Sequence, residues 1–283
     1  MRVLVTGATG YIGGRLVAVL QNQGHELRVL VRHRVDGHWD GIEQVAGNLA
    51  HPASLQDVCQ GVDSVCHLGG GMRPSDGDVT TVNVIGSRAL LDDAMRHHVR
   101  RFVFVSAAVV YGNVKSPPAS EESIGQPLPG HAYAIAKWRA EQQLLTSVHG
   151  NIELVIVRIP QVYSAGSLSI RRFPHLAAQV HGRNLTHFVH REDVVQALAM
   201  LIQSAYPSGT YNVADNFPLT VRDAAALIQQ AMGEDETGPA MNPIPAMLRR
   251  VMEATLVLDT RKIAALGIIP MYSTLEMGLR NEI

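Results

Sequence analysis

Thr6-Gly7-Ala8-Thr9-Gly10-Tyr11-Ile12-Gly13 follows directly on the apolar run Val3-Leu4-Val5. The apolar run predicts a buried strand, and a stripe of apolar residues at helical spacing begins at Ile12. A strand, a tight glycine-containing turn and a helix therefore follow one another at the N-terminus.

The three glycines of this turn each have a distinct use. Gly7 permits the tight turn, Gly10 lets the backbone approach a ligand, and Gly13 lets the helix pack close to the strand. The N-terminus of the helix offers unpaired N–H groups and a positive dipole end to phosphates. The pattern predicts a pyrophosphate-binding turn, with an ordinary strand-to-helix turn as the alternative; a P-loop is disfavoured because no Gly-Lys-Ser/Thr follows.

Composition excludes several classes of protein. The 283 residues carry a formal net charge of −1, so the positive surface of a nucleic-acid binder is missing. Cys59 and Cys66 are too few for a zinc site or a disulfide framework. No apolar run is long enough to cross a membrane. We expect a cytoplasmic enzyme that acts on a small molecule, with no nucleic-acid or membrane partner and no metal.

Strand-like and helix-like segments alternate through the first two-thirds of the chain. Strands are predicted at Arg2–Thr6, Glu26–Val31, Gln44–Gly47, Ser64–Leu68, Arg101–Val105 and Ile152–Ile159. Helices are predicted at Ile12–Gln23, Ser54–Gln60, Val82–His97 and Tyr133–Val148. This alternation predicts an α/β fold of the Rossmann type, a doubly wound parallel sheet with helices on both faces.

The regular alternation ends after Pro160. Helices are predicted at Phe173–Val180, Asp193–Gln203, Val221–Met232 and Ala246–Glu253, and short strands at His187–His190 and Thr210–Val213. Proline-rich Asn113–Gly130 and acidic Gly233–Pro239 are expected to be loops. We expect a Rossmann domain of residues 1–163 and 183–215, with a small C-terminal substrate lobe of residues 164–182 and 216–283.

Tyr133 and Lys137 are the first candidate catalytic pair. They lie four residues apart on a predicted helix and so share one face. A neighbouring ammonium, helped by an oxidised nicotinamide, is expected to lower the pKa of the Tyr133 phenol from its usual value of about 10. The alternative is an amphipathic surface helix that contains both residues by chance.

These motifs, taken in order, resemble the extended short-chain dehydrogenase/reductase family. The resemblance also rests on segments that span the chain: Gly47-Asn48-Leu49, His67-Leu68-Gly69-Gly70, Asn83-Val84-Ile85-Gly86-Ser87, Val110-Tyr111-Gly112, Arg158-Ile159-Pro160-Gln161-Val162-Tyr163, Phe188-Val189-His190-Arg191-Glu192-Asp193-Val194 and Tyr211-Asn212-Val213. It implies a Rossmann domain, a bound nicotinamide dinucleotide and hydride transfer assisted by Tyr133 and Lys137.

The resemblance also implies positions for the cofactor. The pyrophosphate would lie against the turn that contains Gly7, Thr9, Gly10, Tyr11, Ile12 and Gly13. The adenine would lie beside Asn48 and Leu49, and the adjoining ribose beside Leu68, Gly69 and Gly70. Tyr133 and Lys137 would hold the nicotinamide ribose, and Pro160 and Val162 would approach the nicotinamide.

The end of the second predicted strand favours one cofactor over the other. NAD enzymes usually carry Asp or Glu there for the ribose 2′-hydroxyl. Here Arg32 and Arg34 follow the strand, and no carboxylate occurs before Asp36. A guanidinium binds a phosphate through charge-assisted hydrogen bonds, so we predict NADP(H), with a solvated basic loop as the alternative.

The family pattern fails at one catalytic position. Members carry Ser or Thr where this chain has Ala107, and Ser106 would replace it only if the strand end bulges. Otherwise Ser106 points into the packing, and Tyr133 and Lys137 act alone.

Other departures concern the substrate. Ala108 and Val109 cannot replace the Asp-Glu pair of sugar-nucleotide dehydratases, and Thr186 stands where many sugar-nucleotide enzymes have Arg. Arg171, Arg172 and Arg183 would suit an anionic substrate or simply be exposed.

We therefore predict an NADP(H)-dependent oxidoreductase that acts on a carbonyl or alcohol of a small or medium organic substrate. A sugar-nucleotide epimerase is the first alternative, and a non-catalytic NADP(H)-binding or sensor protein is the second. Because the helices predicted at Val82–His97 and Tyr133–Val148 often pair between subunits in the family, a homodimer is expected.

Overall fold

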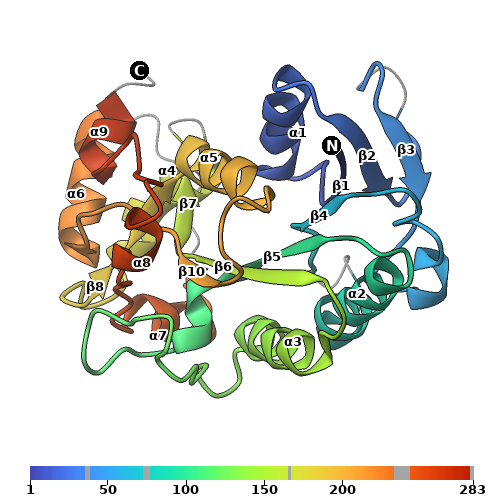
Figure 1. Cartoon of the computed structure of the whole chain (residues 1–283). Coiled ribbons are helices and arrows are strands. Elements are labelled where there is room, and N and C mark those ends of the chain that lie inside the picture. Colours follow the sequence, from blue (N-terminus) through green and yellow to red (C-terminus); the bar gives the residue numbers. More distant parts are fainter. Residues whose placement is uncertain (36–38, 73–76, 165–166, 233–242, 281–283) are drawn as a thin grey trace. The chain divides into compact units, whose positions relative to one another are not determined.

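The computed structural model describes residues 1–35, 39–72, 77–164, 167–232 and 243–280 (Figure 1). Two compact units can be distinguished. The first contains residues 1–106, 132–157 and 195–210, and the second contains residues 107–131, 158–194 and 211–283.

The units differ from the predicted domain boundaries. Residues 107–131, 158–163, 183–194 and 211–215, predicted to belong to the Rossmann domain, fall in the second unit. A buried network ties three of these segments together: Arg158 Nη1 donates to Tyr111 Oη (2.7 Å), and that hydroxyl donates to Asn212 Oδ1 (2.9 Å). Which residues form the domain that binds the cofactor stays a prediction.

A doubly wound sheet is the central feature. Within the described residues, seven strands occur in the order β10-β6-β5-β4-β1-β2-β3. They are β1 (Arg2–Thr6), β2 (Glu26–Val31), β3 (Glu43–Ala46), β4 (Ser64–His67), β5 (Arg101–Ala107), β6 (Glu153–Ile159) and β10 (Gly209–Asn212). β1 pairs in parallel with both β2 and β4, so the strand order reverses beside the glycine turn, where such sheets bind ligands. The predicted fold class is confirmed.

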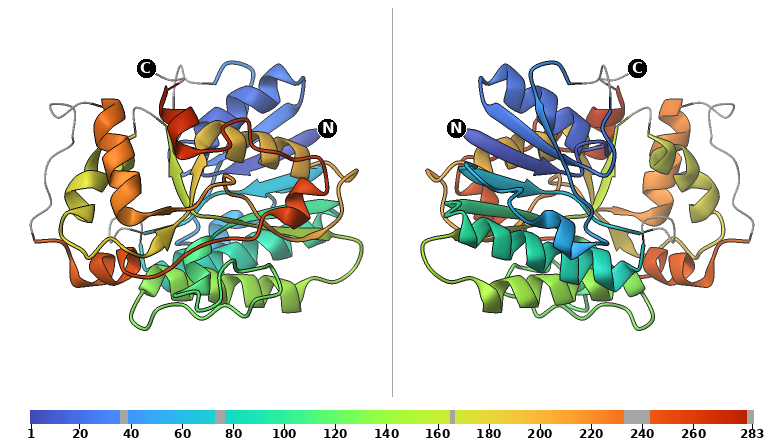
Figure 2. Two further views of the ribbon diagram at one scale, coloured as in Figure 1. Left: turned by 90° about the vertical axis from the view of Figure 1, so that its left-hand side faces the viewer. Right: turned by 90° about the vertical axis from the view of Figure 1, so that its right-hand side faces the viewer.

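Helices cover both faces of the sheet in the first unit. Figure 1 shows α2 (Gly86–Arg96) and α3 (Ala132–Ser147) on one face and α1 (Gly13–Asn22) on the other. α2 and α3 lie side by side (Figure 2), and Arg88 of α2 donates to the Ser147 hydroxyl of α3. None of the helices in the described residues has the length and hydropathy needed to cross a membrane.

Apolar side chains of the strands, α2 and α3 form the core on that face. It contains Leu4, Leu30, Leu55, Val58, Cys59, Val62, Val65, Leu90, Leu91, Ala94, Val99, Phe102, Phe104, Ala140, Leu144, Ile152, Leu154 and Ile156. α3 contributes Ala140 and Leu144 to this core.

The helix predicted at Ser54–Gln60 is wrong. Only a 3₁₀ turn, η1 (Pro52–Leu55), forms there. Asp57 takes a left-handed conformation (φ 61°), which cannot continue a helix. Asp93, buried on α2, accepts hydrogen bonds from the N–H groups of Asp57 and Cys59, both at 2.9 Å, and so holds the chain in a turn.

The helix predicted at Val82–His97 forms, but its first turn is wider than an α-helix. η3 (Thr81–Ile85) is a π-helical turn that leads into α2. The Asn83 side chain donates to the Val79 carbonyl (2.9 Å), which an α-helix would pair with the N–H of Asn83. This competition accounts for the wider turn.

The second unit is built on two helices, α4 (Leu168–Ala177) and α6 (Val221–Met232). Its core contains Tyr163, Ile170, Phe173, Ala177, Phe188, Val221, Ala224, Ile228, Met232, Ile244, Met252, Leu275 and Leu279. The unit also contains η4 (Ala108–Tyr111), β7 (Gln161–Tyr163), β8 (Leu185–Thr186), β9 (Phe188–His190), β11 (Leu219–Thr220), α7 (Ala246–Met252), α8 (Arg261–Ala264) and α9 (Leu275–Arg280), and α5 (Arg191–Leu201) starts in it.

The later predictions are confirmed for the helices at α5, α6 and α7 and for the strands at β9 and β10. The helix predicted at Phe173–Val180 forms as α4, but it begins earlier, at Leu168, and ends at Ala177. The predicted loop at residues 113–130 contains no helix or strand. It is held by backbone hydrogen bonds between Val114 N and Thr255 O and between Ala119 N and Val257 O, both 2.8 Å. The acidic segment predicted as a loop, residues 233–239, lies outside the described residues.

Candidate functional site

The glycine turn has the predicted conformation. Gly7 has φ +70°, and a Cβ there would lie 2.9 Å from Gly69 N. A Cβ on Gly13 would lie 2.1 Å from Gly7 O, and the N–H of Gly10 donates to the same carbonyl at 2.9 Å. Larger residues at positions 7 and 13 are therefore excluded sterically. α1 starts at Gly13, so the N–H groups of its first turn have no partner within the helix and suit an anion.

The ends of β1 and β4 meet beside this turn. A Cβ on Gly69 would lie 2.8 Å from Leu49 Cδ1 and 2.9 Å from Thr6 Oγ1. The structure thus brings Gly7, Leu49 and Leu68–Gly69 together as predicted. Asn48 precedes this group and uses its Oδ1 atom to accept from Ala50 N–H (2.9 Å), while the side-chain amide N–H groups of Asn48 remain as donors.

His67, which is not among the predicted site residues, connects this group to α2. Its Nδ1 atom lies 2.6 Å from Thr6 Oγ1, and its Nε2 atom lies 2.8 Å from Ser87 Oγ. Thr6 Oγ1 also accepts from the N–H of Gly69 at 2.9 Å. Burial lowers the pKa of His67 to about 3, so the ring is neutral and fixes the spacing between the two strand ends. In the sequence, the feature that could have indicated this role is a histidine inside an apolar strand pattern.

Lys137 is buried within the first unit. Its Nζ atom donates to Val105 O at 2.8 Å and lies 4.4 Å from the centre of the Phe104 ring. Burial lowers the pKa of the ammonium from 10.5 to about 8, although the Glu141 carboxylate one turn later acts in the opposite direction. The side chain is only 3% exposed, so its amine has to find polar partners inside the protein.

Tyr133 lies one turn before Lys137 on α3, as predicted. Its pKa is raised to about 12 by burial. The expectation that Lys137 and an oxidised nicotinamide together lower this pKa stays a prediction, because in the chain by itself loss of solvation raises it. At neutral pH the phenol is therefore protonated.

A Cβ built on Gly70 would come close both to the Lys137 ammonium and to Asn83, a second residue outside the predicted site. A Cβ on Gly70 would lie 2.8 Å from Asn83 Oδ1 and 3.6 Å from Lys137 Nζ. Asn83 is fully buried, and its amide donates to Gly71 O (2.8 Å), but its Oδ1 atom has no partner among the described residues. Buried polar atoms normally have one. In the sequence, Asn83 entered only as part of the family-like segment Asn83–Ser87, without a role of its own.

Ser106 is buried near the end of β5. Its hydroxyl has no hydrogen-bond partner in the part of the chain that the structure describes. β5 continues to Ala107, which has extended dihedrals (φ −134°, ψ 142°), so the strand end carries no bulge at that residue. By strand alternation Ser106 shares the face of Phe104, and Ala107 lies on the opposite face. Ser106 was expected to replace the missing Ser or Thr only if the strand end bulged, and Ala107 shows no such bulge.

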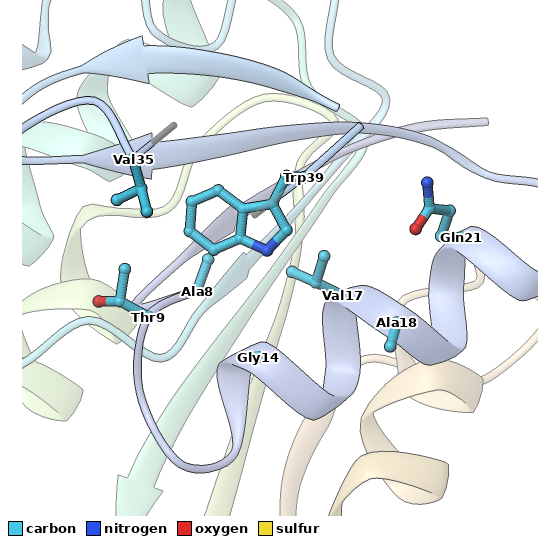
Figure 3. A pocket seen from close by; sticks show the side chains of 8 residues that line it. All are labelled: Ala8, Thr9, Gly14, Val17, Ala18, Gln21, Val35 and Trp39. Atoms are coloured by element: carbon cyan, nitrogen blue, oxygen red, sulfur yellow. The ribbon is translucent and has the colours of Figure 1, made fainter. Parts of the chain in front are cut away.

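Arg32 and Arg34 follow β2 and are exposed. Neither guanidinium has a hydrogen bond or ion pair with any residue in the described ranges. Val35, the next residue, lines a cavity of about 450 Å³ together with Ala8 and Thr9 of the glycine turn (Figure 3). The glycine turn and the residue that follows the two arginines thus border one space.

Trp39 and residues of α1 complete the walls of this cavity. Figure 3 shows the Trp39 indole beside Val17, with Gly14, Ala18 and Gln21 along the helix. Most of this wall is apolar. Tyr11, two residues before α1, is largely exposed, and Ile12 is the residue that precedes the helix.

Other predicted residues belong to the second unit. Pro160 lies between β6 and β7, and Val162 lies in β7. Arg171 and Arg172 of α4 each have a buried Nε atom without a partner in the described chain. The roles of these residues toward a nicotinamide or a substrate stay predictions.

The first unit has the backbone and side-chain groups that a nicotinamide dinucleotide would need. Glycines bring two backbone segments together at the N-terminus of α1, and unpartnered atoms of Asn83 and Ser106 remain inside the same unit as Lys137. These groups offer N–H donors for a pyrophosphate and polar partners for hydroxyl groups. The residues present therefore fit such a group.

Comparisons with known proteins agree with this architecture. The family model described as "NAD dependent epimerase/dehydratase family" matches residues 3–214. A UDP-glucose 4-epimerase from Thermus thermophilus, solved in complex with NAD, has a TM-score of 0.82 at 23% identity and covers 100% of this chain and 97% of its own. At this identity the likeness concerns the fold.

Two curated relatives extend the comparison. Sterol demethylase protein B from Methylococcus capsulatus is 32% identical over 164 residues, or 56% of this chain, and the match spans only half of that protein's length. A ketoreductase from Stigmatella aurantiaca, which acts on a 4-hydroxy-2-methyl-3-oxo-4-farnesyl-3,4-dihydroquinoline-1-oxide, is 26% identical over 82% of this chain and 74% of its own length.

The family model covers the glycine turn, the strands of the central sheet, Tyr133 and Lys137. On these grounds the chain belongs to the NAD-dependent epimerase/dehydratase family, the extended short-chain dehydrogenases/reductases.

Proposed function

We propose that this protein is an NADP(H)-dependent oxidoreductase that interconverts a carbonyl and an alcohol on a small or medium organic substrate. One observation carries the choice of cofactor. Arg32 and Arg34 are exposed and unpaired among the described residues, directly after β2, where NAD enzymes usually have a carboxylate. The likeness to a ketoreductase supports the choice of reaction.

The side chains of α3 supply the acid chemistry. When bound, the dinucleotide supplies or accepts hydride at the substrate carbon. Tyr133, whose phenol is protonated at neutral pH, donates a proton to the substrate oxygen in the reductive direction. Lys137 hydrogen-bonds the ribose hydroxyls and places a positive charge near the phenol. The unpartnered Ser106 hydroxyl is a candidate partner for the substrate oxygen only if the end of β5 rearranges on binding.

Cofactor choice can be tested with arginine variants. Each charge-assisted hydrogen bond to a phosphate contributes about 1.5–3 kcal/mol. Arg32→Ala and Arg34→Ala are therefore expected to lower affinity for NADPH by about 10- to 100-fold each, while affinity for NADH changes little. Fluorescence titration measures both affinities. Arg100→Ala, which removes another exposed arginine (73% exposed side chain), is the matched control. Equal loss of NADPH and NADH binding would contradict the assignment.

A sugar-nucleotide epimerase is the second candidate. The observation in its favour is the pair of buried Nε atoms on Arg171 and Arg172, which have no partner among the described residues and would suit an anionic substrate. Absorbance at the NADPH band separates the two functions. A reductase consumes NADPH steadily with its substrate, whereas an epimerase recycles the cofactor and shows no net change.

A further inference from the structure

The two arginines lie on a turn that is tied down at both ends. On one side, the N–H of Gly47 donates to the carbonyl of Val31, the last residue of β2, at 3.0 Å. On the other side, the Gln44 side chain forms two hydrogen bonds with the backbone of Val35. The N–H of Val35 donates to Gln44 Oε1 and Gln44 Nε2 donates to Val35 O, both at 2.9 Å. Residues 32–34 lie between these ties.

The Gln44 carboxamide replaces a strand partner. β2 and β3 pair in parallel from Arg28 to Val31, and Gln44 lies opposite Val29 in this ladder. Val35 is beyond the ladder, so a side chain of β3 supplies the donor and the acceptor that a backbone neighbour would supply inside it. A carboxamide can donate one hydrogen bond and accept another at once, whereas a carboxylate can only accept.

The same tie fixes one wall of the cavity beside the glycine turn. Val35 borders this space together with Ala8 and Thr9 (Figure 3). A ligand that reaches from the glycine turn toward Arg32 and Arg34 would therefore meet a turn whose position Gln44 determines. Binding to a turn that is already ordered avoids the cost of ordering it.

We propose that Gln44 is a positioning residue for cofactor choice: by holding Val35, it presents Arg32 and Arg34 to the 2′-phosphate of the adenine ribose. Gln44 does not itself contact the phosphate in this proposal. Its contribution is confined to ligands that carry that phosphate, because only they need the two guanidinium groups. The inference rests on the proposed NADP(H) function.

The experiment uses two fragments of the cofactor and the full-length chain. Adenosine 2′,5′-bisphosphate carries the 2′-phosphate, and 5′-AMP lacks it. Calorimetric titration of Gln44→Met, which keeps the length of the side chain and removes both hydrogen bonds, is expected to show about tenfold weaker binding of the bisphosphate, which corresponds to about 1.4 kcal/mol. Binding of 5′-AMP is expected to stay within about twofold of wild type.

Two further variants make the result specific. Gln203→Met is the matched control, because Gln203 is also partly buried and its amide also bonds a backbone carbonyl, that of Ala199 (3.1 Å). It is expected to change neither affinity. Gln44→Glu keeps the acceptor for Val35 N–H and loses the donor to Val35 O; it is expected to weaken bisphosphate binding as well, and it replaces Gln44→Met if that variant does not fold.

The outcomes distinguish the two proposals. If wild type prefers the bisphosphate and Gln44→Met keeps that preference undiminished, the role of Gln44 is wrong and the NADP(H) function stands. Equal weakening of both fragments would show a general structural role and would also overturn the inference. If wild type binds the bisphosphate no better than 5′-AMP, the NADP(H) function is wrong and the inference falls with it.

Discussion

Replacing Lys137 by methionine tests whether the buried ammonium has the pKa that the structure gives it. Burial lowers that pKa from 10.5 to about 8. Each unit of difference between folded and unfolded states corresponds to about 1.4 kcal/mol. Burying the charge therefore costs the folded state about 3 kcal/mol at pH 7, on the order of a fifth to a half of a typical stability.

The sign of the pH dependence follows from proton binding. Below pH 8 Lys137 is protonated in both states, and the folded state carries the full cost of the buried charge. Between pH 8 and 10.5 the folded protein has lost this proton and the unfolded chain still holds it. Stability therefore rises with pH over this interval, relative to a variant that lacks the amine.

Urea denaturation of wild type and Lys137→Met between pH 7 and pH 10 measures the effect. The difference in free energy of unfolding, wild type minus variant, is expected to shift in favour of wild type by about 2 kcal/mol over this range. Other titrating groups are common to both proteins and cancel. Lys115→Met, which removes an exposed lysine, is expected to give a flat difference. A flat difference for Lys137→Met as well would refute the argument from burial.

Three further substitutions test the site and the assembly. Tyr133→Phe is expected to bind NADPH like wild type and to lose at least about 100-fold in turnover, since general acid catalysis contributes about 10²–10⁴; full activity would reject Tyr133 as the acid. Gly70→Ala places a Cβ 2.8 Å from Asn83 Oδ1, a buried atom that has to shift, so we expect weaker cofactor binding by titration together with a lower unfolding midpoint. Leu145→Glu charges a half-exposed apolar position on α3 (49%) and is expected to convert the predicted homodimer to monomers in sedimentation; a wild-type monomer would contradict the dimer.

The fold could be predicted because its signals are local and mutually consistent. A tight turn at Gly7 and a helix that begins within one residue of the predicted Ile12 follow from the glycines and the apolar stripe. The failure at residues 54–60 has a non-local cause. Asp93, more than thirty residues away in sequence, captures the backbone N–H groups of Asp57 and Cys59, and no window of sequence contains both sides of that interaction.

The short elements of the second unit were missed for a different reason. β7, β8 and β11 contain two or three residues each, too few to show a period. They exist because neighbouring segments supply partners: β7 pairs with β9, and β11 pairs with β8. Pairing of this kind depends on tertiary structure rather than on the residues of the strand.

The residues of the candidate site also differ in whether sequence or tertiary structure reveals them. Motifs identified Tyr133, Lys137 and the glycines, because their spacing carries the chemistry. They assigned no role to Asn83 or His67, although both lie in segments that resemble the family, because the importance of these residues lies in which atoms they bond or leave unbonded among the described residues. A residue's environment, unlike its spacing, is a property of the folded chain.

The pKa of Tyr133 shows what this difference means for the reaction. The pair on α3 suggested an acidic phenol, but burial acts on both groups in the direction of their neutral forms: it raises the pKa of Tyr133 to about 12 and lowers that of Lys137 to about 8. Burial keeps the phenol protonated at neutral pH, but the higher pKa also makes it a weaker acid than a solvated phenol. Reduction of a carbonyl needs a proton donor at this position, whereas oxidation of an alcohol needs a base. In the proposed reaction, Tyr133 can act as a base only when an additional positive charge, such as an oxidised nicotinamide, offsets the burial.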